Sequence, residues 1–124
     1  MEDFVSYDIA VKLKEKGYPQ KTFVDSDIKK ACYVHDGRLY KEGCIAPITK
    51  CFTAPTISQV LKWFREAKRI DVGAIWDNRD GKWVGYINEM DMPDLVGEYV
   101  LPNTYDAYEK ASFAGIEYVL DNLI

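Results

Sequence analysis

The alternation of apolar and polar positions is clearest between residues 54 and 88, where it changes from one period to another. Apolar residues first recur every three to four positions, the spacing that places them on one face of a helix. This pattern predicts a helix over about residues 57–68, after the capping-box sequence Thr56-Ile57-Ser58-Gln59. The apolar face of this helix consists of Ile57, Val60, Leu61, Phe64 and Ala67.

A period of two follows this helix. Residues 70–77 and 82–88 have the alternation of strands, and Asp80-Gly81 between them is typical of a tight turn. The sequence therefore predicts an antiparallel hairpin. Gly73 and Gly85 interrupt its two strands, and each is expected at a bulge or at a close helix contact.

Weaker patterns predict the rest of the chain. One helix is expected to begin after Ser6 and to end at Gly17, and another to begin after Asn103 or Thr104. Short strands are expected at residues 22–24, 31–34 and 38–40 and near Ile45 or Cys51, and a loop at residues 89–103. In the last helix Ala111, Ala114 and Gly115 form a patch of small residues against which a sheet can pack closely.

These elements predict one α+β domain over residues 1–124, with the order α-β-β(β)-α-β-β-α. Three helices are expected to pack on an antiparallel sheet of about four to five strands. The composition, 48% hydrophobic and 29% charged, is that of a globular protein. No apolar run approaches the length of a membrane span, and the N-terminus lacks the pattern of a signal peptide. A cytoplasmic location without membrane contact is expected.

The charge is distributed unevenly along the chain. The net charge is −4, but residues 1–69 sum to +4 and residues 70–124 to −8. This asymmetry is compatible with solvated faces that differ in sign, and it also favours self-association or a charged partner.

The three cysteines suggest a zinc site as one alternative. Cys32-x-x-His35, Cys44 and Cys51 supply four nitrogen and sulfur ligands, the number that a tetrahedral site needs. Six residues separate Cys44 from Cys51, however, more than the usual two to four. The competing interpretation is that the cysteines are small core residues with reduced thiols and that His35 lies in an exposed turn.

The sequence carries little that indicates catalysis. It has one histidine, no Gly-x-Ser-x-Gly elbow, no phosphate-binding glycine loop and no His-Glu-x-x-His. A cysteine nucleophile would depend on His35 as its base. The acidic residues Glu89, Asp91 and Asp94 lack the pattern of a calcium loop. We therefore expect no enzymatic activity and no cofactor.

A binding role fits the composition better. Nine tyrosines and three tryptophans are many for so small a core, and aromatic and arginine side chains are favoured at interface centres. The sequence pI near 5.0 disfavours nucleic acid as the partner of the basic helix at Lys62–Arg69. We therefore expect an interaction or accessory protein that binds a protein partner or itself, and Trp63→Ala is expected to disturb that association while leaving the fold intact. The predicted binding residues are Trp63, Lys62, Arg65, Arg69 and Tyr86.

The segment Ala54-Pro55-Thr56-Ile57-Ser58-Gln59, followed by Trp63-Phe64-Arg65-Glu66, resembles a family of small bacterial proteins often associated with phages or prophages. In that family an Ala-Pro-Thr-x-x-Gln start leads into such a helix, and an aromatic hairpin and an acidic helix follow. The acidic helix is similar to Thr104–Ala111. The resemblance implies a phage or mobile-element setting. It assigns no activity and no functional residue.

Overall fold

The computed structural model describes residues 4–20, 23–24, 27–28, 30–34, 37–41, 51–93 and 96–124. Contacts divide the chain into two compact units, Met1–Thr56 and Ile57–Ile124. Each unit combines helical segments with antiparallel strands, so the predicted α+β class is confirmed. Within these described ranges no helix is both long enough and apolar enough to span a membrane. The grouping of residues 1–124 into one domain stays a prediction.

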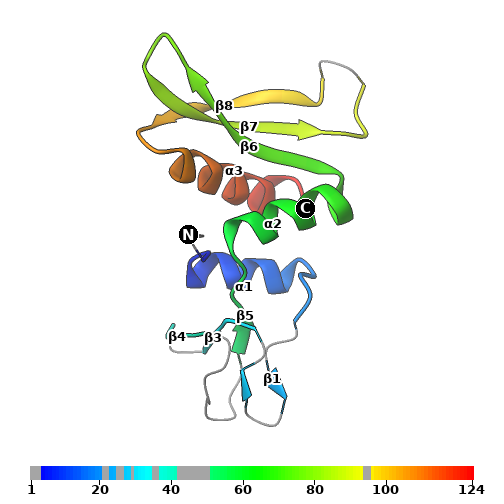
Figure 1. The fold of residues 1–124 in the computed structure, drawn as a ribbon. Helices are drawn as coiled ribbons and strands as arrows, with labels where there is room; N and C mark the ends of the chain where they lie inside the picture. The colour runs from blue at the N-terminus through cyan, green and yellow to red at the C-terminus, as the bar shows by residue number, and fades with distance from the viewer. Residues whose placement is uncertain are drawn as a thin grey trace. The chain divides into compact units, whose positions relative to one another are not determined.

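The first unit begins with helix α1, Tyr7–Glu15, drawn in blue in Figure 1. The Ser6 hydroxyl accepts a backbone amide of the first turn at 3.4 Å, the expected N-cap hydrogen bond. The helix is followed by Gly17, whose φ of 94° lies in the left-handed region, and the Tyr18 amide donates to the Leu13 carbonyl at 2.9 Å. Both predicted ends of this helix are therefore confirmed.

Five short strands complete the described part of the first unit: β1, Phe23–Val24; β2, Asp27–Ile28; β3, Cys32–Val34; β4, Leu39–Tyr40; and β5, Cys51–Thr53. β1 pairs with β2, and the other three form a sheet in the order β4-β3-β5. The expected hairpin of β3 and β4 and the strand at Cys51 are thereby confirmed. The hairpin tip at His35 and the alternative strand position at Ile45 lie outside the described residues.

Aromatic side chains attach α1 to β3 and β5. The Tyr7 ring makes edge contacts with Tyr33, at 5.7 Å between ring centroids, and with Phe52, at 5.8 Å. The Tyr33 hydroxyl donates to the Val5 carbonyl at 2.6 Å. Because side chains alternate across a strand, the neighbouring positions of β3 and β5 face the opposite side of this sheet.

The second unit contains the elements α2, Ile57–Trp63; η1, Phe64–Lys68; β6, Ile70–Asp77; β7, Lys82–Glu89; β8, Glu98–Tyr105; and α3, Tyr108–Asn122. Its antiparallel sheet has the order β6-β7-β8. The predicted hairpin is confirmed as β6 and β7, with Val72 opposite Ile87 and Trp76 opposite Trp83.

The helix predicted over residues 57–68 changes its geometry at Phe64. It is α-helical to Trp63, and η1 is a π-helical segment. Arg69 then has a φ of 59°, and its amide donates to the Phe64 carbonyl. Because a π-helical turn holds more residues than an α-helical turn, the basic residues of this segment do not keep the single face that α-helical spacing predicts.

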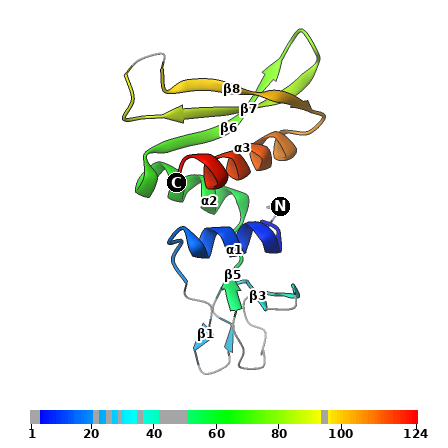
Figure 2. The same cartoon turned by 180° about the vertical axis from the view of Figure 1, so that it is seen from behind.

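α3 packs on one face of this sheet, as both views of the ribbon show (Figures 1 and 2). A Cβ atom at Gly115 would lie 2.6 Å from Val72 Cγ1, and one at Gly85 would lie 3.2 Å from the Ala111 carbonyl oxygen. The expected close approach of small helix residues to the sheet is therefore confirmed. Gly85 also lies at the irregularity in the pairing of β7 with β8, whereas a Cβ at Gly73 would meet nothing within 4 Å. The fully buried residues of this unit include Val60, Phe64, Ile87, Ile116 and Val119.

Three expectations need correction. Residues 89–103 were predicted to form a loop but include most of β8; its Pro102 is tolerated because β8 is an edge strand. α3 begins at Tyr108, since Asn103 and Thr104 belong to that strand. The described strands form two three-stranded sheets and one pair, so each sheet is smaller than the predicted sheet of four to five strands. Strands of two or three residues offer few ladder hydrogen bonds and pair here with partners in their own unit.

Candidate functional site

The tryptophan predicted to bind a partner, Trp63, lies at the junction of α2 and η1 and is half-buried. Its ring centroid lies 5.7 Å from that of Phe64, which is fully buried. The Lys68 ammonium lies 5.3 Å from the Trp63 ring centroid, within the range of a cation–π contact. Trp63 therefore already packs within its own helix, and its replacement would alter that packing as well as any binding.

The predicted basic binding residues each form an ion pair on the surface. Lys62 pairs with Glu66 at 3.9 Å, Arg65 with Asp71 at 3.9 Å, and Arg69 with Asp91 at 3.2 Å. Such exposed pairs contribute little to stability, typically below about 1 kcal/mol. They do place a carboxylate beside each of these cations, which weakens the attraction of this helix for phosphate groups.

Tyr86, the last predicted binding residue, lies on β7 and is half-buried. Its hydroxyl donates to Glu98 Oε1 at 3.2 Å. Partial burial and the nearby carboxylates of Glu98 and Asp71 raise the pKa of Tyr86 above its usual value of 10.0. Asp71 is also the ion-pair partner of Arg65, so the structure brings Arg65 and Tyr86 to one carboxylate. Trp63 and Arg69 have other neighbours, and the five predicted residues do not form one cluster.

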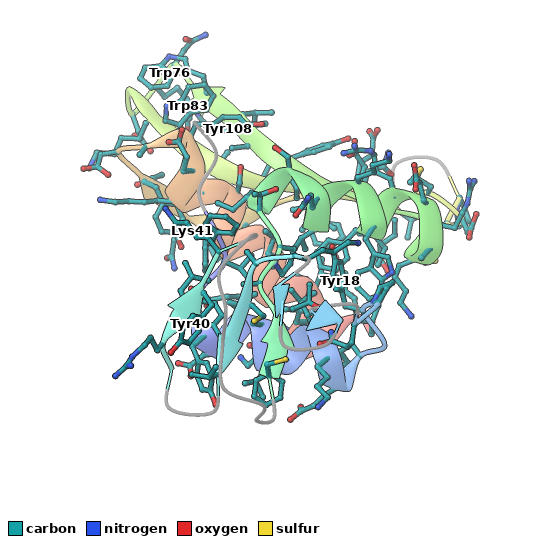
Figure 3. The ribbon with its side chains drawn as sticks, turned by 60° about the horizontal axis from the view of Figure 1, so that its bottom comes forward. Tyr18, Tyr40, Lys41, Trp76, Trp83 and Tyr108 are labelled. Atoms are coloured by element: carbon teal, nitrogen blue, oxygen red, sulfur yellow. The ribbon has the colours of Figure 1, made fainter. Side chains whose placement is uncertain are left out.

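A different aromatic group lies at the turn end of the β6–β7 hairpin. Trp76 and Trp83 are directly opposite each other, with ring centroids 5.3 Å apart, and Trp83 makes an edge contact with Tyr108 at 5.2 Å. We call these three residues the aromatic ladder. Trp76 is 49% exposed and Tyr108 is 44% exposed. Figure 3 shows the three side chains together at one end of the second unit.

The place of the aromatic ladder follows from the packing of α3. Tyr108 is the first residue of that helix, and both ribbon views show the hairpin turn extending past this end of the helix (Figures 1 and 2). Trp83 and Trp76 therefore lie on the helix-bearing face of the sheet but beyond the part that α3 covers. Hairpin register alone predicts that the two tryptophans are neighbours. The contact with Tyr108 also depends on where α3 begins.

Charged residues flank the aromatic ladder in pairs of opposite sign. In the hairpin turn, Arg79 Nε lies 3.5 Å from Asp77 Oδ1. At the start of α3, Lys110 Nζ lies 2.9 Å from the Oδ1 atom of Asp106, which precedes the helix. The Lys110 hydrogen bond and charge lower the pKa of Asp106 below its usual value of 3.8. The aromatic centre is thus bordered by charges that largely neutralise one another.

The zinc alternative requires Cys32, His35, Cys44 and Cys51 to converge. Cys51 packs against the fully buried Cys32, so two of the four are neighbours, and both are thiols not joined in a disulfide. Burial and the adjacent Cys51 raise the pKa of the Cys32 thiol to about 12. His35 and Cys44 lie outside the described residues. Within the part of the chain that the structure describes, no three His, Cys, Asp or Glu side chains are grouped as metal ligands.

Comparison of the chain with protein-family models, with curated proteins and with solved structures gives no match.

Proposed function

We propose that this protein is a non-enzymatic interaction protein and that the aromatic ladder is the centre of its binding surface. The observation that carries the proposal is the exposure of Trp76, which stays 49% accessible although its ring packs against Trp83. Large exposed aromatic side chains in one cluster are characteristic of interaction sites.

The energies favour binding over a purely local role for Trp76. A cross-strand aromatic pair contributes about 0.2–1 kcal/mol to a hairpin. A tryptophan side chain presents roughly 200 Å² of surface, so covering its exposed half removes on the order of 100 Å² from water. At about 25 cal/mol per Å² this contributes about 2–3 kcal/mol, more than the local pair.

The surroundings of the aromatic ladder favour a protein as the partner. An apolar centre with a polar rim is the usual arrangement of a protein–protein interface, and the pairs Asp77–Arg79 and Asp106–Lys110 supply such a rim. Residues 70–124 carry a net charge of −8, which repels phosphate backbones. A second copy of this chain and a different protein both fit this description. The phage setting stays a prediction from the sequence resemblance.

Site-specific photo-cross-linking tests the proposal. A photoreactive phenylalanine derivative replaces Trp76 in one version of the full chain and Glu117, an exposed residue of α3, in the control version. After irradiation in the producing cells and at high concentration in purified form, position 76 is expected to yield a discrete cross-linked species that position 117 does not. A second copy would appear as a covalent dimer of the purified protein, and another protein only in cells. Equal adducts at both positions, or none at position 76, would refute the proposal.

A further inference from the structure

A second feature, independent of the aromatic ladder, lies on the sheet of the first unit. Cys32 on β3 is directly opposite Thr53 on β5, and Val34 is directly opposite Cys51. Cys32 and Cys51 are therefore diagonal neighbours on the same face of two antiparallel strands. Their side chains are in contact.

We propose that Cys32 and Cys51 form a dithiol that small-molecule disulfides oxidise to an intramolecular disulfide. The bond would link β3 to β5 and make residues 32–51 a covalently closed loop. The register places both side chains on one face of the sheet and in contact, so the two sulfur atoms are neighbours before the bond forms.

The chemistry is thiol–disulfide exchange in two steps. The Cys51 thiolate attacks one sulfur of the small disulfide, forms a mixed disulfide, and releases the first small thiol. Cys32 then gives up its proton and attacks Cys51 Sγ, which forms the protein disulfide and releases the second small thiol. Two protein thiols are oxidised, and one small disulfide is reduced to two thiols.

Burial sets the order of these steps. Cys51 is half-buried and is accessible to a small reagent, whereas Cys32 is fully buried and can react only with a neighbour. Opposite Cys32, the buried Thr53 hydroxyl has no hydrogen-bond partner among the described residues. That hydroxyl lies on the same face as the Cys32 thiol and can donate to its sulfur as the thiol loses its proton.

The test uses the full chain with Cys44 replaced by serine, so that two thiols remain, and the unsubstituted chain in parallel. Each protein is treated with EDTA, equilibrated with oxidised glutathione, and alkylated with a maleimide. Intact mass and peptide mapping then give the number and position of the remaining thiols. We expect both thiols to disappear together, a peptide linking Cys32 to Cys51, and a melting temperature raised by about 5–10 °C.

Two single-cysteine variants, each also carrying Cys44→Ser, separate the attacking role of Cys51 from the resolving role of Cys32. With Cys32→Ala, Cys51 is expected to keep a persistent glutathione adduct because no resolving thiol remains. With Cys51→Ala, Cys32 is expected to resist both glutathione and maleimide in the folded protein. Circular dichroism checks that each variant is folded. A stable glutathione adduct on Cys51 while Cys32 is present, or no reaction of either thiol, would overturn the proposal. Either outcome can be observed in the unsubstituted chain, so the test does not depend on a variant.

Discussion

At the scale of single residues, Asp106 has an exposed side chain whose carboxyl pKa is lowered. The Lys110 ammonium hydrogen-bonds its carboxylate at 2.9 Å and stabilises the charged form, which lowers the pKa. A lowered pKa in the fold means that the ion pair persists above the usual pKa and is lost as the pH falls through the lowered value. This pair belongs to the rim of the aromatic ladder.

NMR titration tests the Asp106–Lys110 contact. The side-chain carboxyl resonance of Asp106 is expected to titrate below 3.8 in the wild-type protein and to return toward that value in Lys110→Met. Glu109→Gln, an exposed change at a neighbouring position, serves as the control and is expected to leave the titration nearly unchanged. An Asp106 titration that does not respond to Lys110→Met would mean that the contact does not persist in solution.

Tyr99 shows the opposite kind of shift. Burial is the main cause that raises its pKa well above 10.0, helped by its Tyr118 and Glu89 neighbours; its hydroxyl donates to Glu89 Oε2 at 3.2 Å. A tyrosine with a raised pKa in the fold stabilises the protein fully below about pH 10, and this contribution is lost as the pH rises further.

The free energy of unfolding is therefore expected to fall above pH 10. Urea unfolding at pH 8, 10 and 11 is expected to show this fall in the wild-type protein and a shallower fall in Tyr99→Phe. The slope should not vanish, because burial also raises the pKa of Tyr18 and Tyr33. Identical pH dependence in the wild-type protein and in Tyr99→Phe would contradict this account.

At the scale of elements, the contact of α3 with the sheet depends on Gly115. A Cβ at that position would lie 2.6 Å from Val72 Cγ1, so one of the two elements would have to shift. Gly115→Ala is expected to lower the free energy of unfolding by about 1–3 kcal/mol, the usual cost of overpacking. Gly73→Ala on β6 is the matched control, since its Cβ would meet nothing within 4 Å. Chemical denaturation of both variants measures the difference, and equal stability would show that α3 does not pack this closely.

The periodicity of apolar residues predicts some elements of this chain and misses others. The change from a helical period to a period of two marks the helix before Arg69 and the hairpin after it, because both bury one face. Strand β8 was missed because Pro102 and the exposed Val100 interrupt the alternation, and only its position at the sheet edge makes that sequence acceptable. The π-helical end of the basic helix has no comparable signal in the pattern of residues.

The candidate site was harder to predict than the elements because it depends on contacts between residues that are distant in the sequence. The sequence favours the basic helix as a binding site because its cations are close together along the chain. In the structure each of these cations lies beside a carboxylate, which comes from the next helical turn or from a more distant part of the fold. The aromatic ladder combines residues from a hairpin register with a residue of a distant helix. Register was predictable, whereas the start of α3 at Tyr108 was not.

At the scale of the whole molecule, two separate surfaces are candidates for one partner: the aromatic ladder and the helix that carries Trp63. They differ in what their tryptophans already contact. Trp63 is half-buried beside a fully buried phenylalanine and below Lys68, whereas Trp76 keeps about half of its surface exposed. The loss of Trp76 is therefore expected to cost more in binding than in folding.

The most direct test measures the affinity of the partner cross-linked at position 76, whether a second copy or another protein, for Trp76→Ala and for Arg79→Ala. Arg79 is the matched control because it belongs to the rim, where side chains contribute little to affinity, and its side chain is 92% exposed. We predict that Trp76→Ala raises the Kd at least about tenfold while the free energy of unfolding changes by about 1 kcal/mol or less, and that Arg79→Ala stays within about twofold of wild type. An unchanged Kd for Trp76→Ala would contradict the assignment of the aromatic ladder as the binding surface.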